Sequence, residues 1–268
     1  MRILLAGAAI YAVLLATAVL FQRRLIYFPF SAYKSTPDAA GLPYLENMLV
    51  TRDGTQVCAW HVPADGADAP AVIYLHGNHE NLGGLVPLAS SFRRSGFAFI
   101  AVDYRGYGKS RGTPTEAGLY ADADAAADWA AALGYRPERT LVWGQSLGAG
   151  VAAHLAASRT LAGLVLEGAF PSIAASARLH YPFLAVPEAF IRDRYPTAEN
   201  ASQALCPVLV LQGGRDSIAP PRFGSTVFNS AREPKFFCLV PEAGHNDITP
   251  ETAEVAKALA EFRKTCLK

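Results

Sequence analysis

Short apolar runs alternate with helix-like stretches along most of this chain, and this alternation is the strongest constraint on its fold. The runs rich in Val, Ile, Leu or aromatic residues are 45–51, 56–62, 71–76, 97–103, 141–144, 163–167, 208–212 and 236–240. The helix-like stretches lie near 82–95, 115–133, 146–158, 220–231 and 250–264. From residue 71 onward the apolar runs show little polar alternation, which is typical of parallel strands covered on both faces. The pattern predicts a doubly wound, mostly parallel sheet of about eight strands flanked by helices.

Two departures from the alternation carry information. Asp53-Gly54 separates the first two runs and is a hairpin signal. Between Glu167 and Val208 lie 40 residues rich in proline and aromatic side chains, which is too long for a plain connection. We interpret this stretch as a small, mostly helical cap at about 170–204.

Length and charge bound the domain organisation and the partners. At 268 residues and 51% hydrophobic content, the chain is expected to form one catalytic domain, over 45–268. The 24 basic and 23 acidic residues nearly balance, and no basic run follows a phosphate backbone, so nucleic acid is not an expected partner. The four cysteines have no zinc-site spacing, so no metal is expected and free thiols are favoured.

The amino terminus differs in kind from the rest of the chain. Residues 3–21 contain no charged side chain and are bounded by Arg2 and by Arg23-Arg24. A helix over this run would be about 28 Å long, close to the hydrocarbon thickness of a bilayer. We therefore expect a single-pass membrane anchor over 1–24, followed by a connector over 25–44.

Two features of this segment stay open. Ala16-Thr17-Ala18 resembles a signal-peptide cleavage site, so a cleaved leader is the alternative to an anchor. We favour the anchor because the apolar run continues past that site and meets an aromatic group, Tyr27, Phe28 and Phe30, typical of an interfacial belt. The flanking charges favour a cytoplasmic catalytic domain only slightly, so the side of the membrane is left open.

The strongest chemical signal is the pentapeptide Gly-Gln-Ser-Leu-Gly at 144–148. It lies where a predicted strand ends and a predicted helix begins, the setting of a nucleophile on a sharp strand-to-helix turn. The glycines avoid clashes there, and the Ser146 hydroxyl would project above the sheet next to the helix amino terminus. Ser146 is therefore the predicted nucleophile, the alternative being a solvated helix-capping serine.

A serine hydroxyl needs a base and an acid that orients the base. Of the six histidines, three follow Ser146; His154 lies within the predicted helix at 146–158, His180 lies in the predicted cap, and His245 lies in the loop after the last strand. We assign His245 as the base and place His180 in the cap. Asp216, which follows the strand at 208–212, is the predicted acid, and Glu167, at the end of the preceding strand, is its rival.

The negative oxygen formed during attack needs hydrogen-bond donors. We predict the backbone amides of Leu147, directly after the nucleophile, and of Asn78, in the loop after the strand at 71–76. His76 is interpreted as a residue that holds this loop. In the cap, Phe170, His180, Tyr181 and Phe183 are the candidate substrate contacts.

Taken together, these motifs resemble the α/β-hydrolase superfamily, and more narrowly its membrane-anchored branch of serine aminopeptidase-like and abhydrolase-domain hydrolases. The segments that carry the resemblance are Arg-Leu-Ile-Tyr-Phe-Pro at 24–29, Leu-His-Gly-Asn at 75–78, Asp-Tyr-Arg-Gly-Tyr-Gly-Lys-Ser at 103–110, the pentapeptide at 144–148, Gly-Gly-Arg-Asp at 213–216 and Gly-His-Asn-Asp at 244–247. The resemblance implies the same triad, no metal or organic cofactor, and a structural role for the turn at 103–106. It is less informative about the substrate, since the family includes esterases, thioesterases and peptidases.

The expected function is hydrolysis of an ester, thioester or amide through an acyl-enzyme, with a small-molecule or lipid acyl substrate. The aromatic cap and the adjacent apolar segment favour an ester or lipid substrate. An aminopeptidase-like peptidase and a non-catalytic, membrane-tethered binding protein of the same fold are the alternatives. The relatives that cleave palmitoyl thioesters carry cysteines near the amino terminus, whereas no cysteine precedes Cys58 here.

Overall fold

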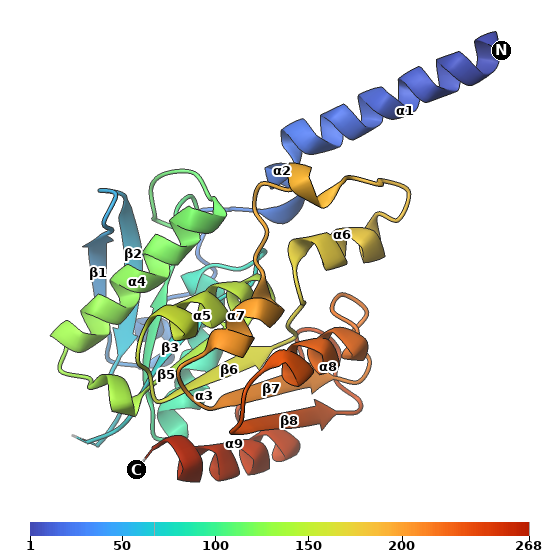
Figure 1. Ribbon diagram of the computed structural model, residues 1–268. Helices are drawn as coiled ribbons and strands as arrows, with labels where there is room; N and C mark the ends of the chain where they lie inside the picture. Colours follow the sequence, from blue (N-terminus) through green and yellow to red (C-terminus); the bar gives the residue numbers. More distant parts are fainter. Residues whose placement is uncertain (67, 268) are drawn as a thin grey trace.

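One eight-stranded sheet forms the centre of the molecule, which we describe from a computed structural model over residues 1–66 and 68–267. The order of the strands across the sheet is β1-β2-β4-β3-β5-β6-β7-β8 (Figure 1). Their bounds are β1 (Leu45–Val50), β2 (Gln56–Val62), β3 (Ala71–Leu75), β4 (Ala98–Val102), β5 (Thr140–Gln145), β6 (Gly163–Glu167), β7 (Val208–Gly213) and β8 (Lys235–Val240). The strand runs expected from the sequence are thus present, each within about two residues of its predicted ends.

Parallel pairing dominates this sheet. β4, β3, β5, β6, β7 and β8 are parallel to one another, whereas β2 is antiparallel to both β1 and β4. The β1–β2 hairpin turns at Asp53-Gly54, where Gly54 has a φ of 81°, a conformation that glycine adopts at low cost. The carboxyl ends of the parallel strands therefore meet at one edge of the sheet, where ligand sites form in such folds.

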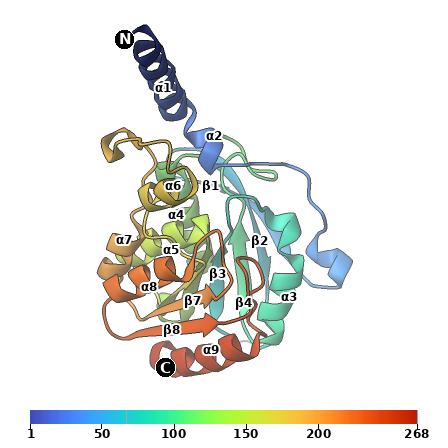
Figure 2. The same cartoon turned by 90° about the vertical axis from the view of Figure 1, so that its right-hand side faces the viewer.

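Helices cover both faces of the sheet (Figure 2). One apolar cluster includes Phe92 of α3 (Val86–Arg94) and Phe262 of α9 (Ala253–Cys266). The other includes Ala126 of α4 (Glu116–Ala132), Val151 of α5 (Leu147–Ser158) and Val227 of α8 (Pro221–Ser230). Because apolar residues on both sides of each central strand are buried, these strands show the near-continuous hydrophobicity seen in the sequence.

The helix expected over 82–95 starts later than predicted. Residues Leu82–Gly84 form a 3-10 turn, η2, and the α-helix follows from Val86. A Cβ atom at Gly83 would lie 2.6 Å from the Tyr33 Cα atom, so the backbone of the segment after the anchor crosses here at close range. Two other 3-10 turns are η1 (Pro37–Ala40) and η3 (Pro137–Arg139).

The amino-terminal helix projects from the domain (Figure 1). α1 (Arg2–Phe21) has no buried residue. Its mean hydropathy of 2.5 and its length of 20 residues would allow it to cross a membrane. α2 (Arg23–Ile26) continues it toward the domain. Tyr27 is only 4% exposed, and its hydroxyl lies 2.9 Å from that of Tyr195, so this tyrosine belongs to the core rather than to an interfacial belt.

The insertion between β6 and β7 contains two helices and a 3-10 turn. α6 (Ile173–His180) is followed by η4 (Glu188–Phe190) and then by α7 (Thr197–Gln203). α7 packs against α5 and α8, so it belongs to the helical layer of the domain. The part from α6 to η4 lies at the α2 end of the molecule (Figure 1).

Stability should depend strongly on Arg105, in the turn after β4. Its guanidinium donates to Asp122, which is fully buried, at 2.8 and 3.0 Å, and to Asp53 at 2.7 Å. Burial raises the pKa of Asp122 to about 6 even beside this arginine. Arg105→Met should lower the free energy of unfolding by about 3–5 kcal/mol, because it leaves a buried carboxylate unpaired. Urea unfolding in detergent, with exposed Arg111→Met as control, measures this, and equal midpoints for the two variants would contradict it.

Candidate active site

Ser146 occupies the sharp turn between β5 and α5. Its backbone has φ 53° and ψ −114°, a conformation that is strained for a residue with a side chain. The flanking glycines make the turn sterically feasible. A Cβ atom at Gly144 would lie 2.1 Å from the Gly148 carbonyl oxygen, and one at Gly148 would lie 1.9 Å from the Leu75 carbonyl oxygen. The close contact of α5 with the sheet therefore requires glycine at both of these positions of the pentapeptide.

His245 and Asp216 come together from the loops after β8 and β7. His245 Nδ1 lies 2.7 Å from Asp216 Oδ2. The other carboxylate oxygen accepts hydrogen bonds from the backbone amides of Ile218 (2.9 Å) and Ala219 (2.7 Å). With both oxygens bonded, Asp216 is fixed in orientation, and its bond to Nδ1 leaves the Nε2 atom of His245 available.

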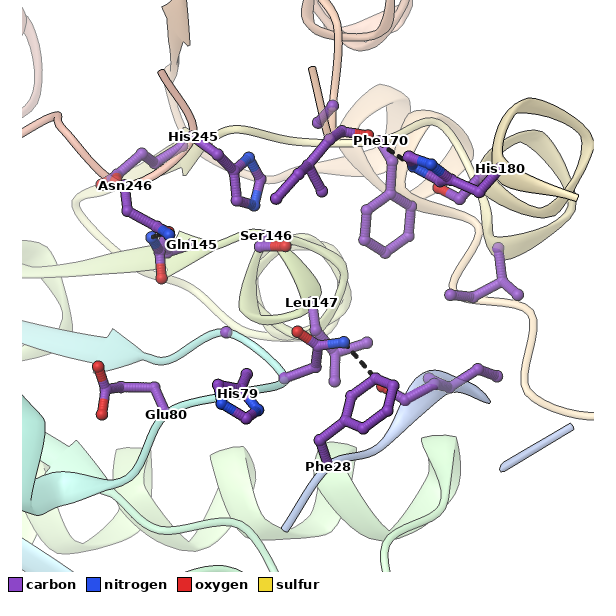
Figure 3. A pocket seen from close by; sticks show the side chains of 18 of the residues that line it. Phe28, His79, Glu80, Gln145, Ser146, Leu147, Phe170, His180, His245 and Asn246 are labelled. Carbon is purple, nitrogen blue, oxygen red and sulfur yellow. Dashed lines mark hydrogen bonds between the residues drawn. The ribbon is translucent and has the colours of Figure 1, made fainter. Parts of the chain in front are cut away.

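One pocket contains Ser146 and His245 (Figure 3). The two side chains, both within the described residues, are not hydrogen-bonded to one another; such a contact often tightens only when the substrate binds. The loop of His245 is nevertheless tied to the serine turn, because Gln145 Nε2 donates to Asn246 Oδ1 at 3.0 Å. The pocket volume is about 940 Å³, near the upper end of small-molecule sites.

Glu167, the alternative acid, is hydrogen-bonded to Trp143 and not to His245. Its carboxyl is 3% exposed and accepts from Trp143 Nε1 at 2.8 Å. Burial, with the nearby charge of Asp216, raises the pKa of Glu167 to about 8. His245 bonds to Asp216 instead, so the geometry favours Asp216 as its partner.

Two backbone amides at the pocket suit a developing negative oxygen. The Ser146 amide is occupied, since it donates to the Glu167 carbonyl at 2.9 Å. Leu147 and Asn78 line the pocket, and neither backbone amide donates to another atom within the described residues. His76, next to this loop, is fully buried; burial lowers its pKa to about 4, and its Nδ1 donates to the Gly77 carbonyl at 2.8 Å, as a loop-holding residue would.

The predicted cap residues divide into two groups. Phe170, His180 and Tyr181 line the pocket, and His180 Nε2 donates to the Ile218 carbonyl at 2.9 Å. Phe183 does not line it: its side chain is 67% exposed, and its carbonyl oxygen accepts from Tyr11 of α1. The physical reason is that the chain turns toward α1 after Tyr181.

Sequence reasoning missed Gly168, which directly follows β6. It has a φ of 54°, and a Cβ atom there would lie 3.0 Å from His245 Cε1 and 3.1 Å from Nδ1. The glycine leaves room for the imidazole. Its place after a strand end was visible in the sequence, but its closeness to a loop nearly eighty residues later was not.

The second omission is a wall of the pocket formed by the amino-terminal segment. Ala18 and Val19 of α1, together with Gln22, Leu25 and Phe28, are among the lining residues. Figure 3 shows Phe28 across the pocket from His245. The uncharged run predicted a membrane helix, and no pattern within it indicated that the same helix also borders a pocket.

The pKa of Glu167 makes stability depend on pH with a definite sign. An unfolded glutamate has a pKa of about 4.3, so between that value and about 8 the folded state holds a proton that the unfolded state releases. Stability should therefore fall as pH rises, by up to about 1.4 kcal/mol per pH unit. Glu167→Gln removes this loss, so its stability relative to the wild type should increase from pH 5 to pH 8 in urea unfolding. If the free energies of unfolding of the two proteins change with pH in parallel, Glu167 does not have this effect.

Comparison with known proteins identifies relatives of this chain. The family model described as serine aminopeptidase, S33, matches residues 67–196. The uncharacterized protein Rv2307c of Mycobacterium tuberculosis is 38% identical over 263 residues, which cover 96% of this chain and 92% of that protein. The lysophosphatidylserine lipase ABHD12 of Danio rerio is 30% identical over 237 residues, covering 74% of this chain and 62% of that one.

The same fold occurs in a solved structure, that of the Pyrococcus furiosus esterase Pf2001. The TM-score is 0.73 at 19% identity, and the match covers 91% of this chain and 98% of the esterase. The fold and the sequence matches lead to one assignment: the chain belongs to the α/β-hydrolase superfamily, in the branch that the serine aminopeptidase model describes.

Proposed function

We propose that this α/β-hydrolase is a membrane-anchored serine hydrolase that cleaves an ester bond, with Ser146, His245 and Asp216 as its catalytic triad. The observation that carries the proposal is the 2.7 Å contact of His245 with Asp216 at the pocket that contains Ser146. A strained serine at a helix amino terminus, a histidine and a buried carboxylate are what nucleophilic acyl transfer requires.

The reaction proceeds through an acyl-enzyme. Ser146 Oγ attacks the carbonyl carbon while its proton passes to Nε2 of His245, and Asp216 stabilises the imidazolium without taking the proton. The backbone amides of Leu147 and Asn78 hold the negative oxygen. His245 then protonates the leaving alcohol, and water repeats the sequence to release the acid.

The lining of the pocket favours an apolar acyl group over a charged one. Leu88, Phe170, Leu184, Val186 and Ile191 are among the lining residues. One relative is a lysophosphatidylserine lipase, and a solved structure of the same fold is that of an esterase. Both support an ester substrate with a hydrocarbon chain.

A peptidase is the second candidate, because the matching family model is described as a serine aminopeptidase. A site for a free α-amine needs an available carboxylate near Ser146. Of the cap acids, Asp193 pairs with Arg23 and Glu188 with Arg178. At the pocket, Glu167 holds its proton up to about pH 8 and Glu251 pairs with Arg94. Glu80 also lines the pocket, accepts from the Asn81 amide at 3.0 Å and has no ion pair among the described residues, so the preference for the ester rests mainly on the apolar lining.

Covalent labelling tests the nucleophile. A fluorophosphonate should label the wild type and not Ser146→Ala, because phosphonylation requires an activated serine hydroxyl. Hydrolysis of matched ester, thioester and aminoacyl amide substrates by unlabelled wild type then identifies the bond, and the ester should be cleaved fastest. A folded wild type that takes no label would support the non-catalytic alternative, and preference for the amide would support the peptidase.

Paired amide substitutions test the acid. Asp216→Asn should lower kcat about 10³–10⁴-fold, because the histidine tautomer is no longer fixed and the imidazolium is not stabilised. Glu167→Gln should leave kcat within a few-fold of the wild type, since its carboxyl is already neutral below about pH 8. Steady-state kinetics at pH 7 measures both, and a larger loss for Glu167→Gln would move the acid to that residue.

A further inference from the structure

The pocket that contains Ser146 is closed on one side by the anchor helix. Ala18 and Val19 of α1 line it together with Gln22. The cap residues Leu184 and Val186 lie on the same lining. One wall of the proposed active site is thus formed by α1. No residue of this helix is buried by the rest of the protein.

The end of α1 also holds the returning part of the cap. Gln22 Nε2 donates to the Phe190 carbonyl at 3.0 Å, and Gln22 Oε1 accepts from the Arg192 amide at 2.7 Å. Arg23 Nε donates to Asp193 at 2.8 Å, and the side chain of that aspartate is only 4% exposed. These contacts fix the cap to the helix at its domain end.

A second set of contacts lies deep along α1. The Tyr11 hydroxyl donates to the Phe183 carbonyl at 3.0 Å and accepts from the Ala185 amide at 3.3 Å. Tyr11 and Gln22 are separated by about 16 Å of helix. The cap loop 181–190 therefore follows α1 for roughly half the length of that helix.

The composition and hydrogen bonding of this loop suit the hydrocarbon region of a bilayer. Residues 181–187 read Tyr-Pro-Phe-Leu-Ala-Val-Pro and carry no charge. Within a bilayer every backbone polar group needs a protein partner, and proline has no amide hydrogen to satisfy. The Leu184 amide donates to the Tyr181 carbonyl and the Val186 amide to the Leu184 carbonyl, while Tyr11 supplies the partner for the Ala185 amide. Within the described part of this stretch, the Phe183 amide alone has no such partner. Phe183 and Phe190 are 67% and 58% exposed, which suits contact with lipid.

We propose that the cap segment 181–187 is inserted in the bilayer beside α1, with Glu188 and its partner Arg178 at the polar boundary, and that the acyl chain of a membrane-resident ester lipid enters the pocket between the segment and the helix. This inference rests on the proposed hydrolase function and names its substrate class. α1 then selects the substrate in addition to anchoring the protein. Cleavage after Ala18 would remove Tyr11 and Ala18, so the proposal requires that the helix is retained in the active protein.

Two tryptophan substitutions in α1 test the entry route. Val19→Trp fills the pocket wall, whereas Val13→Trp lies about 200° around the helix from Tyr11, on a face where Val13 is 64% exposed. Both are compared in nanodiscs on the palmitoyl and butyryl esters of one alcohol. Val19→Trp should lower the palmitoyl-to-butyryl ratio of kcat/KM about tenfold or more, because long chains lose their space. Val13→Trp should leave the ratio unchanged.

Labelling by fluorophosphonate keeps the two proposals apart. If the wild type is not labelled, the hydrolase function itself fails. The membrane entry route alone is overturned by either of two results with a labelled wild type. In the first, Val19→Trp and Val13→Trp have the same palmitoyl-to-butyryl ratio of kcat/KM; in the second, the wild type prefers the butyryl ester.

Loop depth provides a measurement independent of turnover. Phe183→Trp should be strongly quenched by doxyl-labelled lipids in nanodiscs, whereas Phe237→Trp, at an exposed position on β8, should be quenched no more than the wild type. Equal quenching at the two positions would overturn the insertion of the loop.

Discussion

The close contact of α5 with the sheet is the constraint on which the rest of the site depends. At Gly144 and Gly148 the helix approaches β5 and the end of β3 so closely that no side chain fits between them. This contact holds Ser146 in a conformation that costs about 1–3 kcal/mol. The cost is borne by the packing of α5, in which Leu147 is 2% exposed and Ala149 fully buried. Once the turn is fixed, the hydroxyl stands at the edge where the loops after β3, β6, β7 and β8 meet.

Two buried carboxyls lie near this edge, and their surroundings separate them. Asp216 accepts two backbone amides and the imidazole, whereas Glu167 has the single donor Trp143 Nε1. Two charged carboxylates in such a setting repel one another, so the less solvated one keeps its proton. The raised pKa of Glu167 follows from this and from its burial. The strand order thus brings both acids close, and burial with a single donor keeps the proton on Glu167.

Much of this arrangement could be predicted from the sequence because it depends on local patterns. Apolar runs of strand length located the sheet, and the pentapeptide located Ser146, since both signals lie within a few residues. The positions of His245 and Asp216 after strand ends followed from the topology of parallel sheets. The contact of Gly168 with His245 and that of Tyr11 with Phe183 could not be predicted, because each joins segments far apart in sequence. Phe183 was expected at the pocket on the basis of composition, which does not specify the direction of a loop.

The segment after α1 is tied to the loop after β3 through specific hydrogen bonds. The Asn78 side chain donates to the Ile26 carbonyl at 2.9 Å, and the Asn78 carbonyl accepts from Tyr107 Oη at 2.9 Å and from the Phe28 amide. These bonds hold the loop whose backbone amide is proposed to stabilise the oxyanion. The position of that amide therefore depends on residues within a few positions of α1.

This dependence has an energetic consequence for catalysis. Binding energy from a remote acyl chain raises kcat only if it is converted into better positioning of the reacting groups. Here the wall that would contact the chain, at Val19 and Gln22, is continuous along the backbone with Ile26 and Phe28, which hold the Asn78 loop. An acyl chain bound against α1 would thus contact the same segment that orients the Asn78 amide, the proposed oxyanion donor. A short ester makes no such contact, so under this arrangement the gain from a long chain should lie in kcat as well as in KM.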